Sequence, residues 1–105
     1  MRVARVTGQV VSTIKQASLN GFKLLMVCDV NPRAPAIDDA RDGGDRDATY
    51  VAIDLVGVGE GELVVVAHGG AARIAVDASQ APTDAAIVAI IDSMTSGGEA
   101  IFIKE

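Results

Sequence analysis

Two groups of glycines flank one short apolar segment between residues 53 and 74, and they limit how this part of the chain can fold. The first group is Gly57, Gly59 and Gly61, and the second is the pair Gly69 and Gly70. Glycine tolerates positive φ angles and lets another stretch of backbone approach closely. Three alternating glycines before an apolar strand and a pair after it therefore predict a tightly folded junction.

The hydrophobic pattern predicts a protein built mainly from short β-strands. Residues 2–14 nearly alternate between apolar and polar, and Gly8 inside this run suggests a bend or β-bulge. Further strands are expected at 22–30, 50–54, 62–67, 87–92 and 101–103, with a helical turn at 71–74. Pro82 followed by Thr83 and Asp84 is also typical of a helix start, but the β-branched residues after it favour a strand.

Composition supports the same class of fold. Half of the residues are hydrophobic but only 3% are aromatic, so the apolar side chains are mostly Val, Ile, Ala and Leu, which suit strands. Short strands, glycine-rich turns and one or two short helical turns, without a long amphipathic helix, predict a small closed β-barrel. At 105 residues the chain fits one domain spanning 1–105.

Two of the predicted strands are apolar on both faces, which predicts an oligomer. In the strand at 22–30, Phe22, Leu24, Met26, Cys28 and Val30 form a continuous apolar face. Leu25 and Val27 would then point outward, and Leu63 would do so together with Val65 in the strand at 62–67. In a single-layer barrel these four side chains would be left in water unless another subunit covered them.

Charge and composition exclude several functions. The formal net charge of -5 argues against nucleic acid as a partner, because Lys and Arg supply most affinity for phosphates. The longest apolar run, at 85–91, is far shorter than the roughly 20 residues of a membrane-spanning helix, and no leader opens the chain, so we expect no membrane partner and a cytoplasmic location. A single cysteine excludes an internal disulfide or a cysteine-cluster metal site.

The chain offers weak candidates for chemistry. His68 is the only histidine and has no evident nucleophile as partner, while Cys28 has the position of a small buried hydrophobe. The segment 31–48 contains Pro32, Pro35 and many aspartates; it predicts a solvated, mobile acidic loop and matches no calcium-loop spacing. The glycines at 57–61 lack the following Lys-Ser/Thr of a phosphate loop. We therefore expect no enzymatic activity, no cofactor and no metal.

Four segments in order resemble the EutN/CcmL family of bacterial microcompartment vertex proteins. The family pattern Asp-x-Val-Gly-Ala-Gly-x-Gly-Asp, an apolar strand and Gly-Ser-Ala-Ala-Arg corresponds here to Asp54-Leu55-Val56-Gly57-Val58-Gly59-Glu60-Gly61-Glu62 and Gly69-Gly70-Ala71-Ala72-Arg73. The segments at 6–15, 21–25 and 84–92 extend the likeness over nearly the whole chain. Val58 replaces the usual Ala, Gly70 replaces Ser and Ala89 replaces Gly.

This resemblance implies an OB-like barrel that forms five-fold rings and plugs the vertices of a polyhedral protein shell. The implied partners are further copies of the chain and hexameric and pseudohexameric shell proteins. The resemblance also places the glycine junction at the subunit contact or near the ring axis. The residues concerned are Asp54, Val56, Gly57, Val58, Gly59, Gly61, Gly69, Gly70 and Arg73. The alternative is a small OB-like module that binds a ligand or nucleic acid, which acidity and scarce aromatics disfavour.

Overall fold

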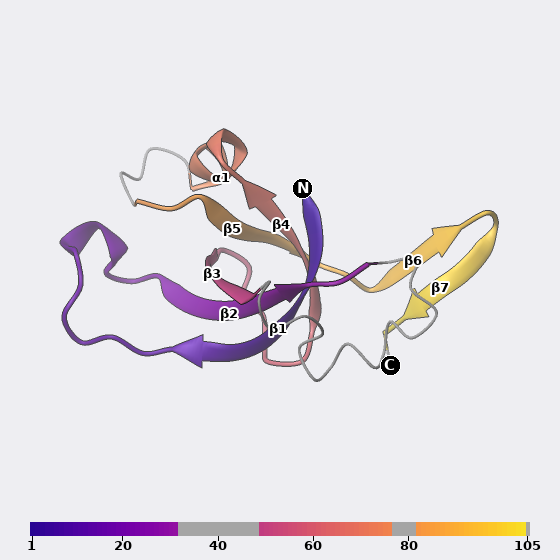
Figure 1. Cartoon of the computed structure of the whole chain (residues 1–105), viewed down its shortest axis with the longest axis horizontal. Coiled ribbons are helices and arrows are strands. Elements are labelled where there is room, and N and C mark those ends of the chain that lie inside the picture. Colours follow the sequence, from indigo (N-terminus) through magenta and orange to yellow (C-terminus); the bar gives the residue numbers. More distant parts are fainter. Residues whose placement is uncertain (32–48, 77–81, 105) are drawn as a thin grey trace.

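The computed structural model describes residues 1–31, 49–76 and 82–104, and its core is a closed five-stranded barrel (Figure 1). The strands follow one another around the barrel in the order β1-β2-β3-β5-β4. Their bounds are β1 (Arg2–Val10), β2 (Lys23–Asp29), β3 (Thr49–Asp54), β4 (Leu63–His68) and β5 (Ala85–Ile90). The predicted barrel is confirmed, and the segment after Pro82 is a strand rather than a helix.

Most neighbouring strands of the barrel are antiparallel. β1 pairs with β2 and with β4, β2 pairs with β3, and β4 pairs with β5, while β3 and β5 form a short parallel ladder. The register between β1 and β2 shifts between Val6 and Gly8, so the bulge expected at Gly8 is present. A bulge bends its strand, and here it lets β1 pair with β4 through residues 2–5 and continue with β2 as far as Val10.

Side chains from all five strands fill the barrel interior. The interior cluster consists of Ala4, Val6, Leu25, Val27, Ala52, Val58, Val64, Val66, Ala85 and Ile87. The prediction that Leu25 and Val27 point outward is therefore wrong, since they are only 2% and 0% exposed. β2 is apolar on both faces, so alternation alone could not decide which face turns inward. Met26 points outward instead, and its side chain lies beside Gly8.

A second cluster lies between the barrel and its short helical elements, η1 (Ala17–Leu19) and α1 (Gly70–Ala75). Ala72 of α1 packs with Ile53 and Ala86 from the barrel strands, and Leu19 and Phe22 pack against the same cluster. The helical turn predicted at 71–74 is confirmed as part of α1. This cluster explains why Ile53 is buried although its neighbour Ala52 points into the barrel interior.

A hairpin of two strands, β6 (Ser93–Ser96) and β7 (Glu99–Ile103), projects from the barrel (Figure 1). Met94 and Phe102 at its base pack against Leu63 and Ile91, and Val65 packs against the same two residues. Leu63 is thus 1% exposed because its own chain covers it, so the prediction that it lies uncovered on the outer face is wrong. Val65 is half-buried in the same cluster.

The acidic loop predicted over 31–48 lies outside the described residues except for Asn31. Within the described ranges, none of the helices has the length and apolar character needed to cross a lipid bilayer.

Candidate functional site

The connection between β3 and β4 is a tight loop held by the side chain of Asp54. Its Oδ1 atom accepts hydrogen bonds from the backbone N–H groups of Val56 and Gly57, and its Oδ2 atom accepts one from Val58, each at 3.0 Å. A carboxylate that accepts several backbone N–H groups stabilises a turn that glycine alone would leave flexible. Asp54 therefore has a role inside its own chain, which is to fix the shape of this glycine loop.

The glycine loop, residues 55–62, contains two positions that require glycine for conformational reasons. Gly57 and Gly61 have φ angles of 84° and 89°, in the left-handed region where a Cβ atom is unfavourable. Val58 between them points into the barrel and is 1% exposed, so its predicted place at a pore or subunit contact is wrong. The family's usual Ala would fill this end of the interior less completely. Val56, by contrast, is 42% exposed.

A buried arginine on β1 fastens the glycine loop to the barrel. The Nη1 atom of Arg5 donates a hydrogen bond of 2.7 Å to the carbonyl oxygen of Gly61, and Arg5 is only 3% exposed. Backbone bonds between Val6 and the loop continue this attachment, from the N–H of Gly61 to Val6 and from that of Val6 to Glu62. Sequence reasoning missed Arg5, although a charged residue inside an apolar strand was a usable signal.

The second glycine pair lies at the other end of β4. Gly69 has a φ of 61° and precedes α1, its N–H donates to the carbonyl of Asp84 at 2.8 Å, and its carbonyl accepts from Ala72. Gly70 is the first residue of α1, and Arg73 is exposed in its last turn. A six-residue strand of roughly 20 Å separates this pair from the glycine loop. The structure therefore does not bring the two glycine groups together within one chain.

Polar side chains close the opposite mouth of the barrel. Arg2, Asp29, Tyr50 and His68 come from four different strands, on the positions that continue the inward-facing rows. The Tyr50 hydroxyl donates to Asp29 Oδ1 at 2.7 Å, and Arg2 Nη1 lies 3.1 Å from Asp29 Oδ2. His68 Nε2 lies 3.2 Å from the Tyr50 oxygen. Because Tyr50 has only one hydroxyl proton, His68 must be the donor in this last contact.

The electrostatics of this polar mouth favour a structural role over proton transfer. Burial, together with the hydrogen bond to Asp29, raises the pKa of Tyr50 well above its ordinary value. Burial and the positive charge of Arg2 lower the pKa of His68 below its ordinary value, so the imidazole is neutral at pH 7. In its contact with Tyr50, Nε2 of His68 carries a proton, so His68 acts there as a hydrogen-bond donor and not as a base.

The described part of the chain shows no other constellation for catalysis. Among the described residues, no three His, Cys, Asp or Glu side chains lie close enough together to hold a metal ion. Cys28 is buried, as predicted, and its thiol lies 3.7 Å from the carbonyl of Asp29. Val58 fills one end of the barrel and the polar residues lie at the other, so side chains of the chain itself occupy the barrel interior.

A small barrel filled by its own side chains, with a connection shaped by backbone geometry, belongs to the structural class of OB-like barrels. Comparisons with known proteins place it more narrowly. The family model described as ethanolamine utilisation protein EutN/carboxysome matches residues 1–92. The shell vertex protein EutN of Escherichia coli is 38% identical over 104 residues, which cover 99% of this chain and 100% of that protein.

Solved structures support the same relationship. CcmL of Nostoc sp. superposes with a TM-score of 0.81 at 39% identity, covering 99% of this chain and 100% of that one. The pentameric shell protein GrpN of Rhodospirillum rubrum gives a TM-score of 0.71 at 36% identity, covering 91% and 99% of the two chains. The chain therefore belongs to the EutN/CcmL family. Its members are structural vertex proteins of microcompartment and carboxysome shells, not enzymes, and they lie in the cytoplasm as part of those shells.

Proposed function

We propose that five copies of this chain form a closed ring that caps the vertices of a bacterial microcompartment or carboxysome-like shell. Likeness along nearly the whole chain to shell vertex proteins, one of them described as pentameric, is the observation that carries this proposal. The filled barrel interior supports it, because such a protomer acts through its outer surface. The ring would contact hexameric and pseudohexameric shell tiles along its rim.

The geometry of a closed shell gives the ring its function. A flat sheet of six-fold tiles closes into a polyhedron only if five-fold units occupy its corners. A five-fold ring is built from heterologous contacts, in which two different surfaces of neighbouring copies meet. We propose that the exposed residues of the glycine junction contribute to these contacts and to the rim, namely Val56, Gly57, Gly59, Gly61, Gly69, Gly70 and Arg73.

The oligomeric state is the first test of this proposal. Light scattering coupled to size-exclusion chromatography at micromolar concentration should give a mass about five times the 10.8 kDa of one chain. A particle with the mass of one chain would contradict the ring.

Shell assembly is the second and more specific test. Shells assembled from matching hexameric tiles without this chain should be open at the corners or elongated, and addition of the chain should seal them. Electron microscopy should then place the protein only at vertices. Equally sealed shells in both preparations, or density for this protein on the facets, would contradict the vertex role.

A further inference from the structure

The hairpin of β6 and β7, here called the arm (residues 93–103), extends beyond the part of the chain that the family model matches, which ends at residue 92. The molecule measures 44 × 25 × 24 Å, and Figure 1 shows the arm projecting from the barrel along the long direction. β6 and β7 pair only with each other among the described strands, so both outer edges of the arm lack a neighbouring strand. An isolated two-stranded hairpin is marginally stable in water and gains stability by packing against a further surface.

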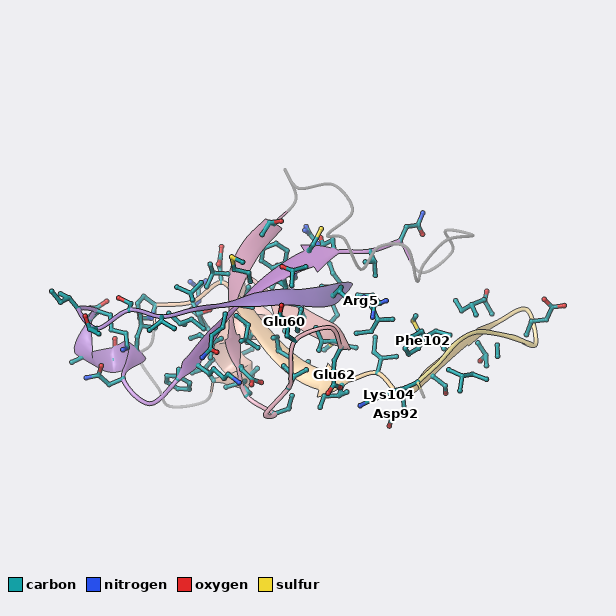
Figure 2. The ribbon with its side chains drawn as sticks, turned by 90° about the horizontal axis from the view of Figure 1, so that it is seen from below. Arg5, Glu60, Glu62, Asp92, Phe102 and Lys104 are labelled. Carbon is teal, nitrogen blue, oxygen red and sulfur yellow. The ribbon has the colours of Figure 1, made fainter. Side chains whose placement is uncertain are left out.

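The base of the arm is firmly attached to its own barrel. Lys104 Nζ lies 2.8 Å from Glu62 Oε2, and the backbone N–H of Lys104 donates to the carbonyl of Asp92 at 2.8 Å. Figure 2 shows Glu62, Lys104 and Asp92 together where the arm leaves the barrel, with Phe102 just beyond them. The arm is therefore held in a defined direction, which lowers the entropic cost of binding a partner surface.

Two isoleucines of β7 are not fully covered by their own chain. Ile103 is 67% exposed, and Ile101 is half-buried. The pairing of β6 with β7 shifts between Met94 and Thr95, so that Phe102 faces Met94 and Ala100 faces Thr95. Ile101 is thus the extra residue of a bulge, and a bulge re-aims the side chains beside it.

The outer wall of the barrel also carries an exposed apolar patch, separate from the arm. Gly8, Met26 and Val51 are neighbours across β1, β2 and β3, and they form the wall patch. Met26 is 36% exposed and Val51 is 46% exposed, on a barrel face that would ordinarily be polar. A hollow of about 190 Å³ beside Val51 is lined mainly by apolar residues that include Leu19, Leu24 and Pro82. This hollow is large enough for one isoleucine side chain.

We propose that the arm of one copy packs on the wall patch of the next copy in the ring, with Ile103 seated at the hollow beside Val51. This inference rests on the proposed five-fold ring. A cyclic ring requires two different surfaces per copy, and the arm and the wall patch are two exposed apolar surfaces of different shape on one chain. One is a projecting strand pair and the other is a sheet face beside a hollow, so a second copy of the chain is the partner that both fit.

Charge substitution at the arm gives the first test. Ile103→Asp should raise the concentration at which the ring dissociates by about tenfold or more, because an isoleucine loses its apolar contact and a carboxylate enters an apolar seat. Ile14→Asp is the matched control, since Ile14 is 92% exposed and belongs to neither surface. Circular dichroism should show that both variants keep the fold. An equal ring stability for Ile103→Asp and the wild type would overturn the proposal.

Cross-linking gives a second test that distinguishes the contact from a general loss of stability. The double variant Ile103→Cys with Val51→Cys should give a ladder of covalent oligomers up to five chains on oxidation, whereas each single variant should give none. Cys28 is buried and does not interfere, and Ile14→Cys with Val51→Cys is the control pair. No ladder for the first pair, or the same ladder for the control pair, would overturn the proposal. A monomeric wild type would instead contradict the ring itself.

Discussion

The guanidinium group of Arg5 donates a hydrogen bond of 2.7 Å to the carbonyl oxygen of Gly61, and this contact joins β1 to the glycine loop 56 residues further along the chain. Gly61 has a left-handed backbone, so its carbonyl points in a direction that a regular strand would not give. The loop and the strand consequently stabilise each other's conformation.

Loss of this contact should destabilise the protomer. We expect Arg5→Ala to lower the free energy of unfolding by about 2–3 kcal/mol, because a hydrogen bond from a charged group and the packing of the arginine stem are both removed. Lys23→Ala, at an exposed position of β2, should change it by less than about 0.5 kcal/mol. Urea denaturation at a fixed protein concentration measures both. Similar values for the two variants would contradict the importance of Arg5.

Loss of the Asp54 side chain should also destabilise the protomer. Asp54→Ala removes the acceptor of three backbone N–H groups, and we expect a loss of about 1–3 kcal/mol in the free energy of unfolding. Asp84→Ala is the matched control, because Asp84 is exposed and contributes its backbone carbonyl to Gly69. If thermal melting showed the two alanine variants to be equally stable, the glycine loop would not depend on Asp54.

The glycines of the loop should divide into two kinds. Gly57→Ala should destabilise the folded protomer by about 1–2 kcal/mol, because its φ is 84°. Gly59 has no positive φ, and an added Cβ would meet its nearest atom, Oε1 of Glu62, at 3.8 Å, an ordinary contact. Gly59→Val should therefore spare protomer folding and weaken the ring, where close approach of another copy is proposed. Denaturation and dilution experiments on the two variants separate these effects.

The polar mouth predicts a dependence of stability on pH. The pKa of His68 is lower in the folded chain than its unfolded value of about 6.5. The folded state thus binds fewer protons, so the contribution of His68 is intact above pH 6.5 and is lost as the pH falls below it. His68→Gln keeps a donor for Tyr50 but cannot titrate. Its stability should fall less steeply than that of the wild type between pH 7 and 5; parallel denaturation profiles would contradict this assignment.

The strands and the bulge could be predicted because their signals are local. Alternation in residues 2–14, β-branched residues at 85–90 and glycine at position 8 each act on their immediate neighbours. The orientation of β2 could not be predicted, because Leu25 and Met26 are equally plausible inside a barrel. The residue on the neighbouring strand decides the orientation of each side chain. Gly8 has no side chain and leaves room for Met26 outside the barrel, while Leu25 packs with Ala52.

The place of Asp54 and the glycines at a subunit contact or pore stays a prediction, while the structure adds how the loop is held. The importance of Asp54 and of the glycines was evident from their spacing, whereas the contacts of Asp54 with its own loop required the geometry. Val58 illustrates the limit, since only the closed barrel shows that it points inward. Arg5 and the pair Glu62 and Lys104 act across long sequence separations, which no local pattern encodes.

The pairing of Arg2 with Val66 has a consequence for how the chain matures. β1 cannot complete its pairing until β4, more than sixty residues later in the chain, has been synthesised. Pairing between such distant segments is typical of proteins that fold in milliseconds to seconds. Until β4 is available, the edge of β1 that pairs with it is open. In the finished chain, removal of residues 2–5 would expose the edge of β4 permanently, and unpaired edges recruit strands from other molecules. Proteolytic damage at the N-terminus should therefore convert a closed protomer into an aggregating one.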